Sequence, residues 1–311
     1  MILRLATFAM GTRFELVLIG EDEVHLRSAG EEAVFEIEEC DRRLSLFRRD
    51  SLLGHLNRVG AASWVRVDTD TFALFRVCAE VHRRSRGAFD PTVAPLMEAL
   101  GFRDAAPGDV AAARERVAWD AVELDPERHA VRFARPGIAL DLGAIGKGHA
   151  LDLAARALAD AGVERALLHG GSSAAVALGP PPGAKGWRIA VAEGPQAPVA
   201  TLAHAAFAVS APEGRTALVD DGERIGHVLD PRTGRSARGV ARAAVIAECA
   251  TSADAWSTAL LVAGRELDVP AELETLFAED GETPTRWHHT PPASGTPIRF
   301  TLPANAREES A

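Results

Sequence analysis

The chain has 311 residues, of which 47% are hydrophobic and 25% charged, and its formal net charge is −10 at pH 7. This length suits one large or two ordinary domains with a sizeable core, and the composition is typical of a soluble globular protein. The negative charge argues against general nucleic-acid binding and against attachment to anionic membranes. An anionic ligand would therefore need a local positive site or a metal ion.

The cysteines and the hydrophobic segments give no sign of export or of a membrane. Cys40, Cys78 and Cys249 are far apart and lack metal-ligand spacing, which favours a reducing compartment. No apolar segment reaches membrane-spanning length, and polar residues interrupt the hydrophobic N-terminus. We therefore expect a cytoplasmic protein with neither nucleic-acid nor membrane partners. The sequence indicates no particular oligomeric state.

The first third of the chain predicts a strand pair followed by helices. A strand is expected over residues 64–67, three helices over residues 22–44, 50–57 and 70–85, and a strand pair over residues 2–8 and 14–19. The strands are joined through Met10-Gly11-Thr12, and Asp50-Ser51 can cap the second helix. Gly87 to Val93 is expected to be a loop, because Pro91 disfavours helix at the residue before it.

The stretch from Asp141 to Asp152 is predicted as a glycine-rich turn that opens a helix. Residues 130–140 alternate loosely like a strand, and alanines recur at helical spacing after Gly148. Three glycines let the backbone approach a ligand, the first helical N–H groups are unsatisfied, and Lys147 adds positive charge. A phosphate suits such a site. The alternative is a helix that needs glycines to pack against a strand.

The second half of the chain predicts many short strands and two helices. Strands are expected over residues 166–169, 174–178, 187–192, 205–210, 225–229 and 243–247. A helix capped by Thr251 or Ser252 follows, and a second helix starts near Pro270. The scarcity of βαβ alternations indicates an α+β fold, with residues 1–303 as one domain and 304–311 as a disordered tail.

Asp254 and Thr258 are the clearest candidates for a metal site. They lie four residues apart, hence on one helix face, with Ser257 beside them. A carboxylate, hydroxyls and an upstream main-chain carbonyl suit a hard, oxygen-seeking cation such as Mg²⁺. The alternative is that Asp254 lies in the first helical turn to complement the helix dipole.

Other polar residues leave two interpretations open. His227 precedes the Asp230-Pro231 turn and could act as a base or a phosphate partner, or could simply bond to the backbone. Asp90 could bind a ligand hydroxyl or form an Asx-type turn. His288 and His289 show no metal-ligand spacing and are interpreted as surface residues.

Six motifs occur along the chain, and their order is more specific than any one of them. They are Met10-Gly11-Thr12, Leu44-Ser45-Leu46-Phe47 with Asp50-Ser51, Gly87-Ala88-Phe89-Asp90-Pro91-Thr92-Val93, Asp141-Leu142-Gly143-Ala144-Ile145-Gly146-Lys147-Gly148, His227-Val228-Leu229-Asp230-Pro231-Arg232-Thr233-Gly234 and Ala253-Asp254-Ala255-Trp256-Ser257-Thr258. In this order they resemble the ApbE-like FAD:protein FMN transferases over about residues 5–264. The resemblance implies a T-fold-related α+β architecture with mixed or antiparallel sheets flanked by helices.

The resemblance also implies an activity and its cofactors. Members of this family hold one FAD in a cleft between two lobes, with Mg²⁺ near the pyrophosphate. They transfer FMN from FAD to a Thr or Ser hydroxyl of an acceptor protein and release AMP, whereas some hydrolyse FAD. The expected partners are therefore FAD as substrate, Mg²⁺, and a flavin-acceptor protein with an exposed Thr or Ser.

The site residues of the family carry over onto positions of this chain. Those that contact FAD correspond to Met10, Phe47, Ala88, Phe89, Asp90, Asp141, Lys147 and His227. Those that bind the metal correspond to the carbonyl of Ala144 and the side chains of Asp254 and Thr258, with Ser257 beside them. In catalysis, Lys147 and Mg²⁺ would stabilise charge on the transferred phosphoryl group. His227, then Asp254, are the candidates for the base.

The chain also departs from the usual family motifs. It has Gly170-Gly171-Ser172 where Gly-Gly-Asp is usual, and Val209-Ser210-Ala211 where Thr-Ser-Gly is common. The usual tyrosine is Phe47, which keeps ring stacking and loses a hydroxyl. The missing carboxylate at Ser172 favours, as an alternative function, a catalytically impaired FAD-binding paralogue. The same metal site would also serve an FAD pyrophosphatase that uses water as its nucleophile.

Overall fold

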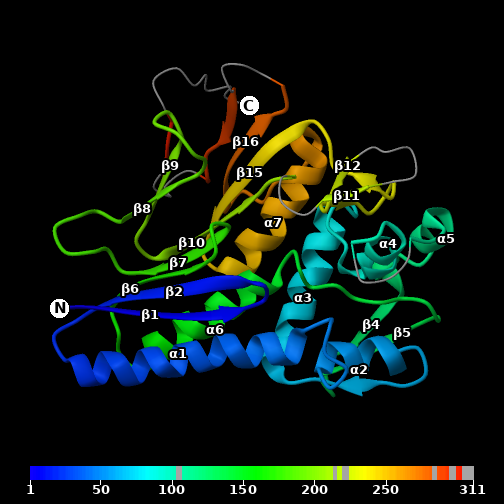
Figure 1. The fold of residues 1–311 in the computed structure, drawn as a ribbon, viewed down its shortest axis with the longest axis horizontal. Helices are drawn as coiled ribbons and strands as arrows, with labels where there is room; N and C mark the ends of the chain where they lie inside the picture. Colours follow the sequence, from blue (N-terminus) through cyan, green and yellow to red (C-terminus); the bar gives the residue numbers. More distant parts are fainter. Residues whose placement is uncertain (103–106, 213–215, 219–223, 282–285, 294–298, 303–311) are drawn as a thin grey trace.

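The computed structural model describes residues 1–102, 107–212, 216–218, 224–281, 286–293 and 299–302. The tail predicted over residues 304–311 lies outside the described residues. Figure 1 shows one large sheet with helices on one side, a small sheet on the other, and a lobe of helices and short strands beside them. This arrangement confirms the predicted α+β fold. No helix in the described parts of the chain is long and apolar enough to cross a membrane.

The large sheet is antiparallel throughout, with strand order β1-β2-β6-β7-β10-β15-β16-β17. These strands are, in the same order, Ile2–Ala9, Thr12–Ile19, Arg165–Gly170, Ala174–Leu178, Ala205–Ser210, Val240–Ala247, Glu274–Glu279 and Trp287–Thr290. Alternation along β2 and β6 buries Phe14, Leu16 and Leu168 on one face. The antiparallel pairing places the β1–β2 turn, the β6–β7 turn and the end of β10 at the same end of the sheet.

Three long helices pack on one face of this sheet (Figure 1). They are α1 (Glu23–Leu44), α6 (Gly146–Asp160) and α7 (Ala250–Ala263). The predicted cap of α7 at Thr251 or Ser252 is wrong, because the helix starts at Ala250 without a side-chain cap of its own. Asp152 of α6 takes that role, accepting hydrogen bonds from the N–H groups of Ala250 at 2.7 Å and Thr251 at 2.8 Å. A carboxylate from a neighbouring helix thus satisfies the first N–H groups of α7.

A three-stranded sheet covers the opposite face of the large sheet, with strand order β18-β9-β8. Its strands are Phe300–Thr301, Val199–Leu202 and Trp187–Ala190. Ala200 and Phe300 pack with Phe207 and Leu276 of the large sheet in a second hydrophobic core. β8 and β18 are the two edge strands of this small sheet. Within the described residues, β8 therefore pairs with β9 on one side only.

The remaining elements form a lobe beside the large sheet (Figure 1). Its helices α2 to α5 are Leu52–Val59, Thr69–Arg84, Ala94–Ala99 and Val110–Arg114, and its strands β3 to β5 are Val65–Arg66, Val122–Asp125 and Ala130–Phe133. Two strand pairs, β11–β12 and β13–β14, follow at Thr216–Leu218, Arg224–Gly226, Leu229–Asp230 and Arg235–Ser236. Short 3₁₀ turns occur at Pro91–Val93, Trp119–Ala121 and Gly264–Glu266. A small core of Leu96, Ala113 and Leu229 joins α4 and α5 to β13.

The strand predicted over residues 225–229 is divided between β12 and β13, and two further predicted elements differ from the structure. The strand predicted over residues 130–140 ends at Phe133, and an irregular segment leads from it to α6. The helix predicted from Pro270 is a turn followed by β16, which pairs with β15 on one edge and β17 on the other. Ladder hydrogen bonds on both edges stabilise a strand there, whatever the local sequence prefers.

The prediction that His288 and His289 lie at the surface is wrong, because both are buried on β17. His289 Nε2 lies 3.0 Å from Oε1 of the buried Glu274 on β16. The same carboxylate accepts hydrogen bonds from the N–H groups of Arg299 at 2.8 Å and Phe300 at 2.8 Å. These partners are distant in sequence, so local patterning gives no sign that this histidine belongs to the core.

Candidate active site

A cleft of about 1570 Å³ runs along the end of the large sheet where the β1–β2 and β6–β7 turns lie. The sheet contributes these turns, the end of β10 and the start of β15 to its lining, and the lobe contributes Ala88–Pro91 and His227–Leu229. Small-molecule pockets usually measure about 300–1,000 Å³. The cleft therefore has room for more than one small ligand.

The cleft brings together nearly all the residues predicted for the site. Those that line it are Met10, Phe47, Ala88, Phe89, Asp90, Asp141, Ala144, Lys147, His227, Asp254 and Thr258. They come from the β1–β2 turn, the α1–α2 and α3–α4 connections, the start of α6, the segment before β13, and α7. Ser257 is the exception, because its side chain is fully buried and the cleft lining does not include it.

The glycine-rich turn leads directly into α6, as the sequence predicts. Asp141 Oδ1 accepts a hydrogen bond from Gly143 N–H at 2.9 Å, which closes the turn. Ile145 precedes the helix, and its apolar side chain cannot cap the first N–H groups. Lys147 is half-buried in the first turn, with Nζ 3.4 Å from the carbonyl oxygen of Gly143. The N–H groups of Gly146 and Gly148 already donate to the Leu142 oxygen at 2.7 Å and to Asp254 Oδ2 at 3.0 Å. The positive end of the helix dipole and the Lys147 ammonium group make the turn a suitable anion site.

The helices α6 and α7 touch through their backbones at Gly148. A Cβ atom at this position would lie 2.1 Å from the carbonyl oxygen of Ala250, so only glycine permits the approach. The contact lets Gly148 N–H donate to Oδ2 of Asp254 at 3.0 Å. Lys147 Nζ lies 3.9 Å from the same oxygen, and the Asp254 side chain is only 5% exposed. Lys147, the basic residue of the glycine-rich turn, and Asp254, the acidic residue of α7, therefore lie next to each other.

Ser210, at the end of β10, forms a hydroxyl cluster with Ser257 and Thr258. Its Oγ lies 2.9 Å from Ser257 Oγ and 3.3 Å from Thr258 Oγ1. Ser257 Oγ also donates to the main-chain oxygen of Asp254 at 2.9 Å. Ser210 lines the cleft and holds the Thr258 hydroxyl in place. Sequence reasoning did not single out its side chain, because no spacing rule relates the end of β10 to α7.

The oxygen atoms at this point fit a hard cation. Asp254, Thr258 and Ala144 belong to one cleft lining. Mg²⁺ commonly takes one or two carboxylates together with substrate phosphates and water. Within the described ranges, no group of three or more His, Cys, Asp or Glu residues could hold a metal by itself. Ser257 directs its hydroxyl to Ser210 and to the backbone, and its role as a ligand stays a prediction.

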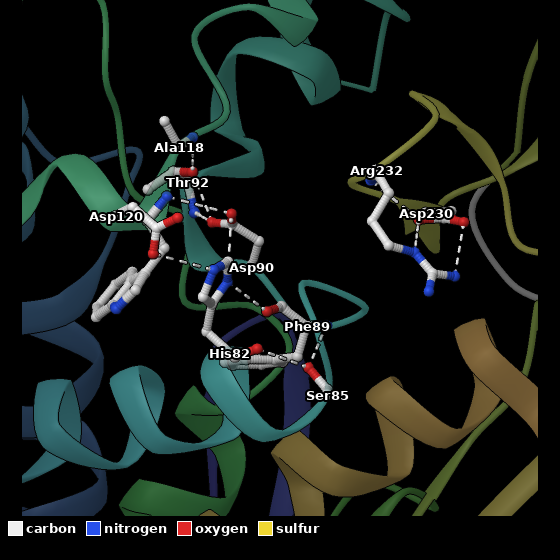
Figure 2. Close-up of polar contacts among 10 residues, drawn as sticks. His82, Ser85, Phe89, Asp90, Thr92, Ala118, Asp120, Asp230 and Arg232 are labelled. Carbon is white, nitrogen blue, oxygen red and sulfur yellow. Dashed lines mark hydrogen bonds and ion pairs between the residues drawn. The ribbon is translucent and has the colours of Figure 1, made fainter. Parts of the chain in front are cut away.

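Asp90 organises the loop between α3 and α4, as Figure 2 shows. Its Oδ1 accepts hydrogen bonds from Thr92 N–H at 2.8 Å and Thr92 Oγ1 at 2.6 Å, and its Oδ2 accepts from Trp119 N–H at 3.3 Å. His82 Nδ1 lies 3.4 Å from Oδ2. Burial raises the pKa of this carboxyl group above its usual value. The Asx-type turn is thus present, while a contact between Asp90 and FAD stays a prediction.

His227 reaches the cleft from the loop before β13, and its side chain is half-buried. The turn that follows is held by Arg232, whose Nε and Nη2 lie 2.9 Å and 3.0 Å from the two carboxylate oxygens of Asp230 (Figure 2). Arg114 Nε donates to the main-chain oxygen of Arg232 at 2.8 Å and ties the loop to α5. The histidine is therefore carried on a braced loop.

Two aromatic side chains in the cleft lining are exposed. Phe47, after α1, is 66% exposed, and Phe8, at the end of β1, is 74% exposed. Exposed rings of this kind suit stacking against a planar ring system. Family resemblance identified Phe47, whereas nothing in the sequence analysis pointed to Phe8.

The fold and the site define an α+β protein whose polar centre joins two helices in a cleft at the end of an antiparallel sheet. The solved ApbE protein of Thermotoga maritima has this fold, with a TM-score of 0.81 and 30% identity over 90% of this chain and 95% of that one. The ApbE family model matches residues 10–275, and the chain therefore belongs to the ApbE family. The FAD:protein FMN transferases of Klebsiella pneumoniae and Treponema pallidum are both 31% identical to it, over 278 and 266 residues. These alignments cover 83% and 78% of this chain, and 77% and 73% of those enzymes.

Proposed function

We propose that this chain is a Mg²⁺-dependent transferase that moves FMN from FAD to a threonine or serine hydroxyl of an acceptor protein and releases AMP. Relatives that are 31% identical bear the name of this activity. The observation that carries the proposal is the meeting of Lys147, Asp254 and Thr258 in one cleft. A lysine, a carboxylate and a hydroxyl beside a helix N-terminus are suited to a pyrophosphate and its cation.

Different parts of the cleft match different parts of FAD. The pyrophosphate matches the N-terminus of α6, where the Lys147 ammonium group and the helix dipole supply positive charge in a chain of net charge −10. The exposed rings of Phe8 and Phe47 match the planar flavin. Binding in this acidic protein therefore depends on local charge and not on a basic surface.

The cation site would use oxygen ligands from α7 and from the glycine-rich turn. Asp254, Thr258 and the carbonyl of Ala144 would hold Mg²⁺, and Ser210 would keep the Thr258 hydroxyl oriented. When bound, Mg²⁺ supplies Lewis-acid charge next to the pyrophosphate.

In the transfer, the acceptor oxygen forms a bond to the FMN phosphorus while the P–O bond to AMP breaks. Lys147 stabilises the negative charge on the phosphoryl oxygens and on the departing AMP. The proton of the acceptor hydroxyl passes to a base, for which His227 is the first candidate. Asp254 is the second, because its carboxylate lies in the same cleft lining as Lys147.

One observation favours a second function for the same site. Ser172 is exposed in the cleft lining, at the position where family members usually carry a carboxylate. Without that carboxylate, water could replace the acceptor hydroxyl and give FAD hydrolysis, or FAD could bind without turnover. Both outcomes would use the same lysine and the same cation ligands.

We also propose a cytoplasmic location. Cys40 and Cys78 are buried as free thiols, and Cys249 is a third free cysteine. Unpaired cysteines of this kind are typical of proteins in a reducing compartment.

The variant Asp254→Asn tests the metal-dependent chemistry. AMP release from FAD is followed by chromatography over a series of Mg²⁺ concentrations. We expect the wild type to saturate and to stop when EDTA is added. Asp254→Asn should need at least about tenfold more Mg²⁺, because a neutral amide is a weaker ligand for a hard cation. Ser252→Ala, on the same helix outside the cleft, should match the wild type. An unchanged Mg²⁺ dependence in Asp254→Asn would contradict the proposed site.

A further inference from the structure

The cleft continues past the residues that the family motifs identify. Toward the edge of the large sheet that is formed by β17, away from β1, the cleft is lined by Ala190–Glu193, Ala241-Arg242, Ala278 and Trp287. None of these residues belongs to the six motifs that point to FAD and Mg²⁺. Because the cleft exceeds the usual volume of a small-molecule pocket of about 300–1,000 Å³, this far half has room for a second occupant.

The far half of the cleft borders the outward edge of β8. Val191 N–H donates to the oxygen of Pro198 at 2.9 Å, toward β9, while Thr201 N–H donates to Arg299 at 2.9 Å, away from β8. In an antiparallel ladder these directions alternate along the strand, so the N–H and C=O groups of Arg188 and Ala190 point away from β9. On that side the described residues of the small sheet add no further strand. Such an edge can accept an extended polypeptide.

A continuous series of contacts connects this edge to the polar centre. Arg242 Nη1 donates to the carbonyl oxygen of Val191 at 3.3 Å, which fastens the end of β8 to β15. Ala243, the next residue, pairs with Ser210 across β10 and β15. Ser210 Oγ lies 3.3 Å from Thr258 Oγ1. A segment at the β8 edge would therefore lie in the same cleft as the centre.

We propose that the outward edge at the end of β8, at Ala190 and the two residues that follow it, binds the hydroxyl-bearing segment of the acceptor protein as an added strand. The inference rests on the proposed transferase function. The hydroxyl that receives FMN must enter a cleft whose carboxylate, Asp254, is only 5% exposed, and an extended segment can do this where a folded surface cannot. Main-chain hydrogen bonds would hold the segment whatever its side chains, while Ala278 and Trp287 offer an apolar floor.

The variant Ala190→Pro tests this edge, because proline removes the outward N–H yet is tolerated on edge strands. The probe is a synthetic peptide with one threonine, chosen from a peptide library because the wild type adds one FMN to it. We expect the KM for this peptide to rise about tenfold, while the Kd for FAD stays within twofold of the wild type. Arg188→Pro is the matched control, because it removes an outward N–H group that lies outside the cleft lining. Its KM for the peptide should stay within twofold of the wild-type value.

Amide hydrogen exchange of the wild type provides a readout that needs no variant. Adding the peptide to the FAD-loaded protein should slow exchange at Ala190 and Ala192, and leave Ile189 unchanged. An unchanged KM in Ala190→Pro, or no protection at Ala190 and Ala192, would overturn the edge while leaving the transferase intact. A dimer of the wild type that Ala190→Pro dissociates would assign the edge to a second copy and overturn the proposal. If the wild type cleaves FAD but modifies no peptide, the proposed transferase function is wrong. The proposal that the β8 edge binds an acceptor segment is then overturned with it.

Discussion

The Asp254 carboxylate connects the glycine-rich turn to α7. Its Oδ2 accepts from Gly148 N–H at 3.0 Å and lies 3.9 Å from Lys147 Nζ. The anion site at the glycine-rich turn and the shared helix face of Asp254 and Thr258 could each be predicted from local spacing. Their meeting could not, because Gly148 and Asp254 are 106 residues apart in the sequence. Ser210 escaped prediction for the same reason.

The variant His227→Asn tests the proposed base. Asparagine keeps a polar side chain of similar reach but cannot take up the proton, so we expect the transfer rate to fall about 10²-fold or more. The Kd for FAD, from a fluorescence titration, should stay within twofold. His25→Asn, on the exposed side of α1, is the matched control and should transfer at the wild-type rate. A loss of FAD binding without a selective loss of rate would count against this role.

The buried His149 on α6 predicts a loss of stability in mild acid. Burial lowers its pKa to about 4, and its Nε2 has no hydrogen-bond partner among the described residues. The unfolded chain protonates this histidine below pH 6.5, the folded chain only near pH 4, so folding stability falls as pH drops between these values. Between pH 7 and 4.5 the wild type should lose about 2.5 kcal/mol more unfolding free energy than His149→Gln. Urea titrations of both proteins at the two pH values measure the unfolding free energies. An equal loss of stability in the wild type and in His149→Gln would contradict the prediction.

At the level of elements, the contact between α6 and α7 positions the centre. Gly148 permits the close approach, and Asp152 satisfies the first N–H groups of α7 from the neighbouring helix. The sequence predicted the existence of both helices, α6 from alanines at helical spacing and α7 from a candidate cap. It misplaced the cap of α7 and made a helix of residues near Pro270, because those features are decided by neighbours that are remote in sequence.

The variant Gly148→Ala tests the importance of this contact. The added methyl group would meet the backbone of Ala250, so we expect the unfolding free energy to fall by about 3 kcal/mol. Gly146→Ala, two residues earlier on the same helix, is the control, since its nearest neighbour would be Met10 Sδ at 4.0 Å. The control should change stability by less than about 1 kcal/mol. Chemical denaturation measures the unfolding free energy of both variants. Equal losses of stability would contradict a close backbone contact between α6 and α7 that only glycine permits.

At the level of the whole molecule, the antiparallel order of the sheet creates the cleft. The strand ends and turns that line it come from β1 to β17, and the lobe supplies the opposite side. The sequence supported the α+β class and the site motifs, because each depends on local patterns and on their order along the chain. It did not indicate the strand order or the far half of the cleft, since both depend on pairings between distant segments.

Mass spectrometry of an acceptor tests the proposed function most directly. The purified wild type is incubated with FAD, Mg²⁺ and a candidate acceptor protein that carries an exposed threonine, and AMP is followed in parallel by chromatography. We predict a mass gain of one FMN on the acceptor, AMP in equal amount, and neither product after EDTA. AMP without any mass gain across a panel of acceptors would instead show an FAD hydrolase. The absence of both products at saturating FAD and Mg²⁺ would contradict the proposed enzyme and leave a protein that only binds FAD.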